Sequence, residues 1–392
     1  MIKKIFISTG EVSGDLHGSL LARALFEESE KRSIQIEIFG LGGERMREAG
    51  VNIMHDTTSV SAIGIWEALP LVVPTLKIQK RFYKLLISNS PNCLILIDYM
   101  GPNINIGRKI RRKNIQIPIY YYIAPQEWAW RVGNNSTTDL ISFSNKIFAI
   151  FKDEADFYSK RGGKVSWIGH PMVDLTEKLP CKSLSRKHLK LKNNENILLM
   201  MPASRPQEIK YILPTFMKVA NKLQEKYPNL VVFIPSCRDT FEEKFAKALQ
   251  RYNVKGRIVR SKDIEENKPF IYSLSTLALC KSGTVNMELA LYGIPQVVGY
   301  KVSRVTAFIA KKILKFKVRF ISPVNLLMRK RIVPEFVQKD FEVNRILKKS
   351  SQIMDKPNQK IKIKNGYKSL KKTLGDKGVV QRAASEILDS LI

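Results

Sequence analysis

The chain has 392 residues, of which 44% are hydrophobic, so it is long enough for two globular domains and too apolar to be disordered. Its formal net charge of +31 at pH 7 favours polyanionic partners: phosphorylated substrates, an anionic membrane surface or nucleic acid. The excess clusters near the carboxyl end of the chain, in residues 301–319 and 345–382.

The four cysteines and four histidines are scattered without paired spacing, which predicts neither a disulfide framework nor a metal site. No stretch approaches the ~20 apolar residues of a membrane span. The apolar run at the N-terminus is too short for a signal peptide. We therefore expect a cytoplasmic protein.

The chain opens with a predicted strand at residues 2–8, followed by the G-E-V-S-G-D turn of residues 10–15 and a helix to about residue 28. The turn lacks the G-x-G-x-x-G fingerprint, so a dinucleotide site is not favoured. Glu11 and Asp15 would lie at the mouth of the sheet, where carboxylates accept hydrogen bonds from sugar hydroxyls. Asp15 could instead cap the following helix.

After a second strand at residues 34–39, residues 60–76 carry one charged residue in seventeen and are broken by two prolines. This stretch predicts either a buried helical pair or a surface that meets lipid, and burial is the commoner outcome.

A strand at residues 92–97 ends at Asp98, and acids at the carboxyl ends of parallel strands point into the ligand crevice. Partial desolvation there would raise the pKa of Asp98 and make it a better proton acceptor. The next strand, 117–123, runs into P-Q-E-W-A-W-R, whose Trp128, Trp130 and Arg131 could bind a sugar and an anion or could close the domain edge.

Predicted strands at residues 146–151 and 164–168 complete the first β/α array. The polar, lysine-rich composition of residues 175–196 predicts a linker. We therefore place an N-terminal domain at 1–174 and a C-terminal domain at 175–378. The final helix, 379–392, could pack back on the first domain.

The second array starts with a strand at residues 197–201, after which Ser204 and Arg205 precede a long predicted helix that ends near residue 227. An arginine at a helix start facing the crevice could brace a diphosphate. Strands at 230–234 and 257–259 continue the alternation. Two successive β/α arrays predict two doubly wound, Rossmann-like α/β domains.

Residues 276–300 are the centre of this second array: a strand at 276–280, a Ser282-Gly283-Thr284 turn, a helix at 285–291 and a strand at 296–299. The turn would present backbone N–H groups to a phosphate, and Glu288, one helical turn further on, could hold a ribose. The glycines could equally serve packing alone.

Residues 302–318 form a basic amphipathic pattern, which fits an anionic membrane surface or an ordinary surface helix. A loop and the start of another helical region are expected over 323–338.

These motifs, taken in order, resemble those of the lipid-A-disaccharide synthase family of GT-B glycosyltransferases over nearly the whole chain. The matching motifs are G-E-x-S-G-D at 10–15, P-x-x-W-A-W-R at 125–131, G-H-P-x-x-D at 169–174, S-R at 204–205, S-G-T at 282–284 with Glu288 and G-x-P at 293–295, P-V-N-L-L at 323–327 and V-x-E-x-x-Q at 333–338. The family's D-A-P-D-F-N appears as D-Y-M-G-P-N at 98–103, so its second acid is missing.

The resemblance implies a GT-B fold, in which two Rossmann-like domains face a central cleft. It also implies an inverting enzyme without a metal or other cofactor. It would condense UDP-2,3-diacylglucosamine with 2,3-diacylglucosamine 1-phosphate (lipid X), giving lipid A disaccharide 1-phosphate and UDP. Asp98 would be the general base, and Glu11 and Asp15 would orient sugar hydroxyls.

On the same grounds, the remaining site residues divide between the two substrates. The UDP-sugar donor would contact Ser204, Arg205, Ser282, Gly283, Thr284, Glu288, Asn325 and Gln338. The acceptor or lipid side would include Ser13, Ile65, Trp66, Trp128, Trp130 and Arg131. The implied partners are lipid-linked sugars and the anionic inner face of the cytoplasmic membrane, with no nucleic acid and a possible homodimer.

Two other functions are also compatible with the sequence. A UDP-N-acetylglucosamine 2-epimerase or another GT-B enzyme would share the two sheets but not the apolar 60–76 stretch. A non-catalytic binder of membrane or nucleic acid would explain the charge, but the acids at strand ends argue against it.

Overall fold

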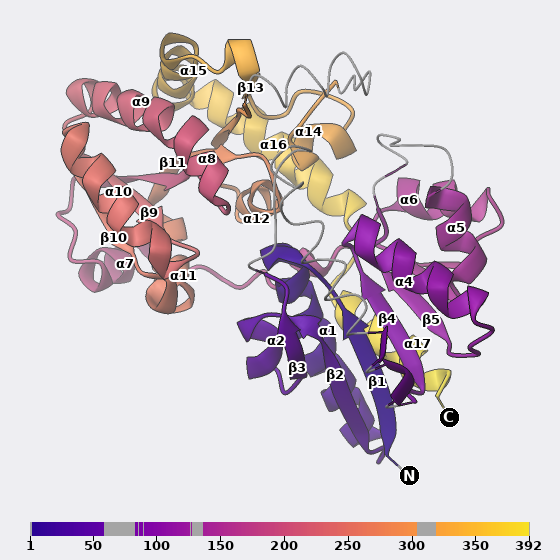
Figure 1. Ribbon diagram of the computed structural model, residues 1–392. Helices are drawn as coiled ribbons and strands as arrows, with labels where there is room; N and C mark the ends of the chain where they lie inside the picture. The colour runs from indigo at the N-terminus through magenta and orange to yellow at the C-terminus, as the bar shows by residue number, and fades with distance from the viewer. Residues whose placement is uncertain are drawn as a thin grey trace. The chain divides into compact units, whose positions relative to one another are not determined.

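The chain divides into two compact units in the computed structural model (Figure 1). Unit 1 comprises Met1–Leu175 and Lys372–Ile392, and unit 2 comprises Thr176–Lys371, so the chain returns to unit 1 earlier than residue 379. The structure describes residues 2–58, 83–84, 86–88, 90–125, 127, 136–303 and 319–391.

Unit 1 is built on a seven-stranded parallel sheet of order β3-β2-β1-β4-β5-β6-β7. Its strands are β1 (Lys3–Ser8), β2 (Ile36–Gly42), β3 (Asn52–Asp56), β4 (Cys93–Ile97), β5 (Ile119–Tyr122), β6 (Lys146–Ala149) and β7 (Val165–Trp167). Its helices include α1 (Glu11–Lys31), α2 (Glu44–Glu48), α4 (Met100–Arg112), α5 (Ser136–Phe143), α6 (Lys152–Ser159) and α17 (Val379–Asp389). The strand order reverses between β1 and β4, which is where open α/β sheets bind ligands.

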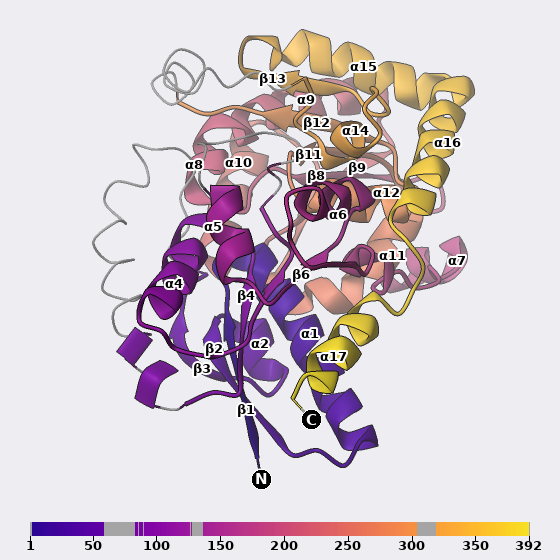
Figure 2. The same ribbon diagram turned by 90° about the vertical axis from the view of Figure 1, so that its right-hand side faces the viewer.

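The core of unit 1 lies on both faces of this sheet. All five residues of β4 are buried, as expected for a central parallel strand covered by helices on both sides. Figure 2 shows α4 on one side of the sheet and α1 with α17 on the other. The apolar face of α17 is buried against α1, although the two helices stand at opposite ends of the chain.

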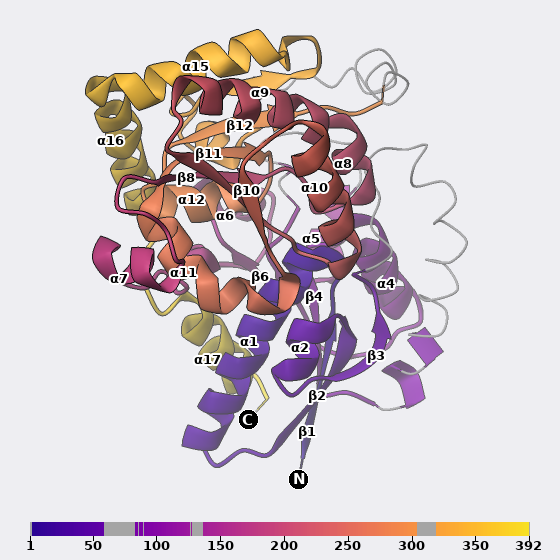
Figure 3. The same cartoon turned by 90° about the vertical axis from the view of Figure 1, so that its left-hand side faces the viewer.

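Unit 2 repeats the plan with a six-stranded parallel sheet of order β10-β9-β8-β11-β12-β13, around which helices pack (Figure 3). Its strands are β8 (Asn196–Met201), β9 (Leu230–Pro235), β10 (Gly256–Val259), β11 (Ser275–Lys281), β12 (Gln296–Tyr300) and β13 (Glu335–Val337). Its helices include α7 (Lys182–His188), α8 (Pro206–Tyr211), α9 (Leu213–Lys226), α10 (Asp239–Arg251), α11 (Ile264–Leu274), α12 (Val285–Leu291), α14 (Pro323–Leu327), α15 (Val343–Asp355) and α16 (Pro357–Thr373). The order reverses between β8 and β11.

Several local expectations were wrong. The linker region contains α7, the long helix predicted to residue 227 is divided at Ile212 into α8 and α9, and residues 335–337 form β13 where a helix was expected. The strand β13 has only three residues and exists because β12 offers it a parallel edge, a signal that local sequence does not carry.

The second strand was predicted to end at residue 39, but β2 continues through the glycines at positions 40 and 42. A Cβ on Gly40 would lie 2.3 Å from the Ile7 carbonyl oxygen, so the neighbouring strand approaches too closely for any side chain.

Candidate active site

Asp98 stands directly after β4, at the reversal point of the unit 1 sheet, and is half-buried. Both Asp98 and Tyr99 have left-handed backbones, with φ of 45° and 49°. This conformation is costly for residues other than glycine and persists only where the surroundings enforce it. The Asp98 carbonyl oxygen accepts hydrogen bonds from Asn103 Nδ2 at 2.9 Å and Tyr121 Oη at 2.8 Å.

Asn103 ties the ends of the two central strands together. Its fully buried amide accepts a 2.7 Å bond from Ser8 Oγ, and its Nδ2 also lies 3.1 Å from the Ile97 carbonyl oxygen and 3.2 Å from that of Ser8. Asn103 closes the motif that begins at Asp98, and its amide supplies both the acceptor and the donor that this network uses. It holds the backbone of the proposed base.

Tyr99 also lies against the turn that follows β1. A Cβ on Gly10 would come within 2.5 Å of the Tyr99 ring, so the two loops at the reversal point are in close contact. Glycine at position 10 is what permits that approach.

The Asp15 side chain is buried and hydrogen-bonded within unit 1. Its carboxylate accepts hydrogen bonds from the N–H groups of Gly43 (2.7 Å), Arg45 (3.1 Å) and Met46 (3.1 Å), so it caps α2. The predicted alternative role was a cap on α1, whereas the capped helix is a different one. Burial raises the pKa of Asp15, although the three N–H groups lower it in part. Ser13 is half-buried in α1.

Two further buried acids of unit 1 were not predicted from the sequence. The buried Glu127, directly before the W-A-W-R sequence of residues 128–131, accepts hydrogen bonds from the hydroxyls of Ser136 and Thr137. Glu154, on α6, accepts from Ala124 N at 3.1 Å and from Ile150 N at 3.0 Å. Burial raises the pKa of Glu154 to about 8, with a smaller contribution from the charge of Asp98. No local pattern marked Glu154.

The remaining candidates of the acceptor or lipid side lie outside the described residues. These are the stretch 60–76 with Ile65 and Trp66, the residues Trp128, Trp130 and Arg131, the side chain of Glu11, and most of the basic segment 302–318.

In unit 2, Ser204 and Arg205 follow β8 at the second reversal point. Their backbone N–H groups donate to one oxygen of Glu208, at 2.5 Å and 3.0 Å, which fixes the loop before α8. The other Glu208 oxygen pairs with the ammonium of Lys281 at 3.0 Å. Lys281, the last residue of β11, was not predicted as a site residue because lysines are too common in this chain to be marked by type alone.

Some of the polar groups of the Ser282-Gly283-Thr284 turn already form hydrogen bonds within unit 2. Ser282 Oγ donates to the Ile321 carbonyl oxygen at 2.6 Å, and Gly283 N–H donates to Asn286 Oδ1 at 3.0 Å. Asn286 is fully buried and was also missed. A ligand anion would therefore compete with Asn286 for the Gly283 N–H group.

Glu288 lies on α12 with its carboxylate 3.3 Å from the Lys268 ammonium. Burial lowers the pKa of Lys268, but the charges of Glu288 and Glu265 outweigh it and the net shift is upward. The ion pair holds Glu288 in place while leaving it partly exposed, at 19% of its side chain.

The Asn325 side chain joins α14 to the backbone of residues 332–333 by hydrogen bonds. Its Oδ1 accepts from Ile332 N at 2.7 Å and Val333 N at 2.9 Å, and its Nδ2 donates to the Val333 carbonyl oxygen. Glu335, the first residue of β13, accepts a hydrogen bond from Ser322 N at 2.9 Å. Gln338 follows β13 in a left-handed conformation, with φ of 50°.

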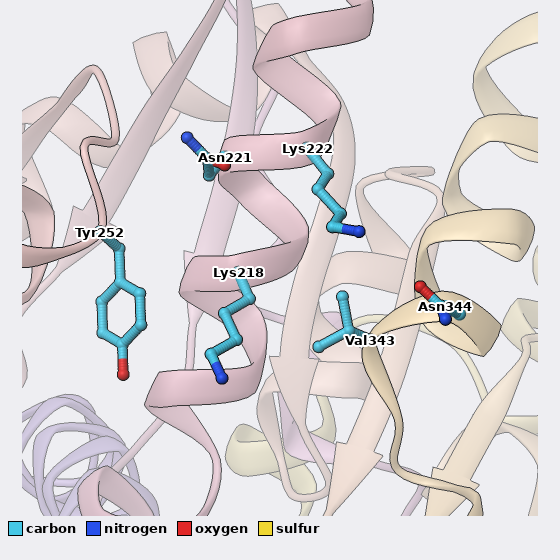
Figure 4. Close-up of a pocket in the computed structure, with 6 residues that line it drawn as sticks. All are labelled: Lys218, Asn221, Lys222, Tyr252, Val343 and Asn344. Carbon is cyan, nitrogen blue, oxygen red and sulfur yellow. The ribbon is translucent and has the colours of Figure 1, made fainter.

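Among the described residues, no group of His, Cys, Asp or Glu could hold a metal ion, and no helix is long and apolar enough to span a membrane. A hollow of about 290 Å³ opens between α9 and α15 (Figure 4), and exposed lysines on α9 contribute to its wall. It includes none of the site residues named above: its lining is Lys218, Asn221, Lys222, Tyr252, Val343 and Asn344.

Two parallel sheets with matching strand order, each with polar and charged side chains at its reversal point, define a GT-B fold. Solved structures agree: S. aureus MnaA with UDP superposes with a TM-score of 0.67 at 14% identity, covering 100% of this chain and 98% of that one. UDP-GlcNAc 2-epimerase from Neisseria meningitidis bound to UDP-GlcNAc gives a TM-score of 0.58 at 14% identity, covering 100% and 99%. At such identity the likeness concerns the fold alone.

The family follows from sequence comparison. The family model described as lipid-A-disaccharide synthetase matches residues 5–388. The lipid-A-disaccharide synthase of Prochlorococcus marinus (strain MIT 9313) is 49% identical, with 98% of each chain covered, and that of Gloeothece citriformis (strain PCC 7424) is 40% identical, with 98% and 99% covered. The chain belongs to the lipid-A-disaccharide synthase family, which consists of glycosyltransferases of lipid A biosynthesis.

Proposed function

We propose that this chain transfers a 2,3-diacylglucosamine unit from its UDP ester to 2,3-diacylglucosamine 1-phosphate, forming the lipid A disaccharide 1-phosphate and UDP. The observation that carries the proposal is the family match, which extends across both units and includes both reversal points. A shared fold alone would not distinguish a transferase from an epimerase.

In this mechanism Asp98 acts as the general base. It takes the proton of the acceptor hydroxyl while that oxygen attacks the anomeric carbon of the donor and the bond to the UDP oxygen breaks. One in-line displacement converts the α-linked donor into a β-linked product. The support is positional: Asp98 follows a central strand, is half-buried, and has a backbone held by Asn103 and Tyr121.

The UDP leaving group would meet Arg205 and the Ser282–Thr284 turn, so that protein donors stabilise the developing charge without a metal. Glu288 would accept the ribose hydroxyls, and Gln338 would contact the nucleotide or the donor sugar. The Asn325 amide is used by Ile332 and Val333, so we assign Asn325 the task of shaping the donor loop.

On the acceptor side, Glu11 and Ser13 would meet sugar hydroxyls, and Asp15 would act by holding α2 in place. Both substrates carry acyl chains, so we propose a peripheral position on the inner face of the cytoplasmic membrane. Residues 60–76, the Trp128–Arg131 motif and segment 302–318 are the proposed lipid or acceptor contacts. A homodimer is compatible with this arrangement.

The test is a mass-spectrometric assay of purified protein with both lipid substrates, run with and without EDTA. We expect disaccharide phosphate and UDP in equal amounts in both cases. UDP release without disaccharide would keep the donor half of the proposal and reject the acceptor. Interconversion of UDP-N-acetylglucosamine with its 2-epimer, in the absence of any transfer, would replace the proposal with an epimerase.

A further inference from the structure

Lys281 brings a positive charge to the reversal point of the unit 2 sheet. It ends β11 and immediately precedes the Ser282–Thr284 turn, and β11 pairs directly with β8, whose loop carries Ser204 and Arg205. The side chain crosses from one loop to the other, because its ammonium lies 2.6 Å from Ser204 Oγ. Lys281 therefore sits where a ligand of this sheet is expected.

The ammonium is held in one place. Its side chain is 15% exposed, and Glu208, its partner at 3.0 Å, is 1% exposed. A lysine ammonium has three donor hydrogens, and the described contacts use two of them, one to Ser204 and one to Glu208. A third donor hydrogen is left for a ligand.

The local charge also favours an anion. The Glu208 carboxylate is already stabilised by the N–H groups of Ser204 and Arg205, so Lys281 is not required to satisfy it alone. Two cations, Arg205 and Lys281, stand against one carboxylate, that of Glu208, at the ends of these two strands. Since Gly283 N–H is taken by Asn286, side-chain cations must supply much of the attraction for phosphate at this turn.

We propose that Lys281 contacts the diphosphate of the UDP-sugar donor, with Ser204 and Glu208 fixing its ammonium and its third hydrogen donated to a phosphate oxygen. This proposal rests on the proposed function, since it assumes a UDP-linked donor in unit 2. In it, Lys281 shares with Arg205 the negative charge that grows on UDP as the sugar leaves.

The test compares the affinities for UDP and for uridine, measured by calorimetry on the full chain. We expect Lys281→Met to weaken UDP binding by about 10- to 100-fold, the range for a charged hydrogen bond, and to leave uridine binding within about twofold. Lys281→Arg should retain most of the UDP affinity. The matched control Lys244→Met, on the exposed face of α10, should change neither affinity.

A purely structural Lys281 would give a different pattern: Lys281→Met would weaken UDP and uridine alike, or neither, and either result overturns the proposal. If Lys281→Met does not fold, Lys281→Gln keeps a neutral donor to Glu208 and still removes the charge. Binding needs no acceptor lipid, so a wild-type protein that binds UDP but makes no disaccharide refutes the proposed function and leaves the Lys281 comparison interpretable. Wild-type protein that does not bind UDP refutes both.

Discussion

At the scale of single residues, the backbone around Asp98 is the most constrained part of unit 1. Consecutive left-handed residues cost about 1–3 kcal/mol each, and hydrogen bonds from Asn103 and Tyr121 help to maintain that conformation here. This arrangement fixes the start of the Asp98 side chain before any substrate binds. It is the kind of preorganisation that a general base requires.

We therefore expect Asp98→Asn to lower the rate constant of disaccharide formation by about 10²- to 10⁴-fold, the usual contribution of a positioned base. The melting temperature should stay close to that of the wild type, because the amide has nearly the same shape. Asp156→Asn, which removes an exposed acid on α6, is the control and should retain full activity. An Asp98→Asn variant with near-normal turnover would exclude Asp98 from the role.

The buried histidines His17 and His170 predict how stability responds to acid. Their rings lie 6.2 Å apart, and His17 Nδ1 has no hydrogen-bond partner among the described residues. Burial lowers the pKa of His17 to about 4, from 6.5 for a free histidine. Below pH 6.5 the unfolded chain therefore gains a proton that the folded chain does not, and stability falls as the pH drops towards 4.

Replacing His17 by Phe should remove this loss. Between pH 8 and pH 5.5, the free energy of unfolding of the wild type should fall by roughly 1 kcal/mol more than that of His17→Phe. Urea denaturation at the two pH values measures it. His55→Phe, at an exposed position on β3, serves as the control and should show no such difference. Parallel pH profiles for wild type and His17→Phe would contradict the assignment.

At the scale of elements, α17 joins unit 1 through a cap from a distant residue. Both carboxylate oxygens of Asp174 accept backbone N–H groups, from Gly378 at 2.7 Å and Val380 at 2.9 Å. Removing a helix cap costs about 0.5–2 kcal/mol, so Asp174→Ala should destabilise unit 1 by that amount. Hydrogen exchange in residues 379–389 should become faster, because the first turn of α17 loses its anchor.

The same helix offers a matched control at its other end. Asp389 forms an ion pair of 2.6 Å with Arg32, but its side chain is 62% exposed. Exposed pairs contribute little, so Asp389→Ala should change stability far less than Asp174→Ala. Equal effects of the two substitutions would show that the Asp174 cap has no special part in holding α17.

At the scale of the whole molecule, the charge of +31 is distributed unevenly along the chain. The helix α16 carries six lysines and no acid, and five of these lysines are exposed. Each basic residue close to an anionic membrane contributes about 1 kcal/mol. A surface of this kind fits an enzyme whose substrates both carry acyl chains.

Changing four of the α16 lysines to Gln should weaken binding to vesicles that contain anionic lipid by about tenfold or more. The positions are Lys362, Lys364, Lys368 and Lys371. Cosedimentation at low and physiological salt measures the change. A control removes the same charge from α9 and α10, at Lys218, Lys222, Lys244 and Lys247. Equal losses in the two variants would mean that total charge, not α16, determines binding.

The class of fold, the family and the positions of most central strands could be predicted from the sequence alone. Continuous apolar runs such as residues 93–97 identify buried parallel strands without any tertiary information. A strand that ends in an acid or a small turn also predicts where the crevice lies, which is how Asp98, Ser204, Arg205 and the Ser282–Thr284 turn were selected. Those predictions depend on local periodicity, which involves only residues that are close together in the sequence.

The partners that these residues meet become apparent in the folded chain. Asp15 caps a helix that begins 29 residues later, at Glu44, and Lys281 pairs with Glu208, 73 residues earlier in the chain. The short strands β3 and β13 exist only because a neighbouring strand offers them an edge. The order of strands in a sheet brings such residues together, and that order follows from how the crossovers pack, not from any pattern within one segment.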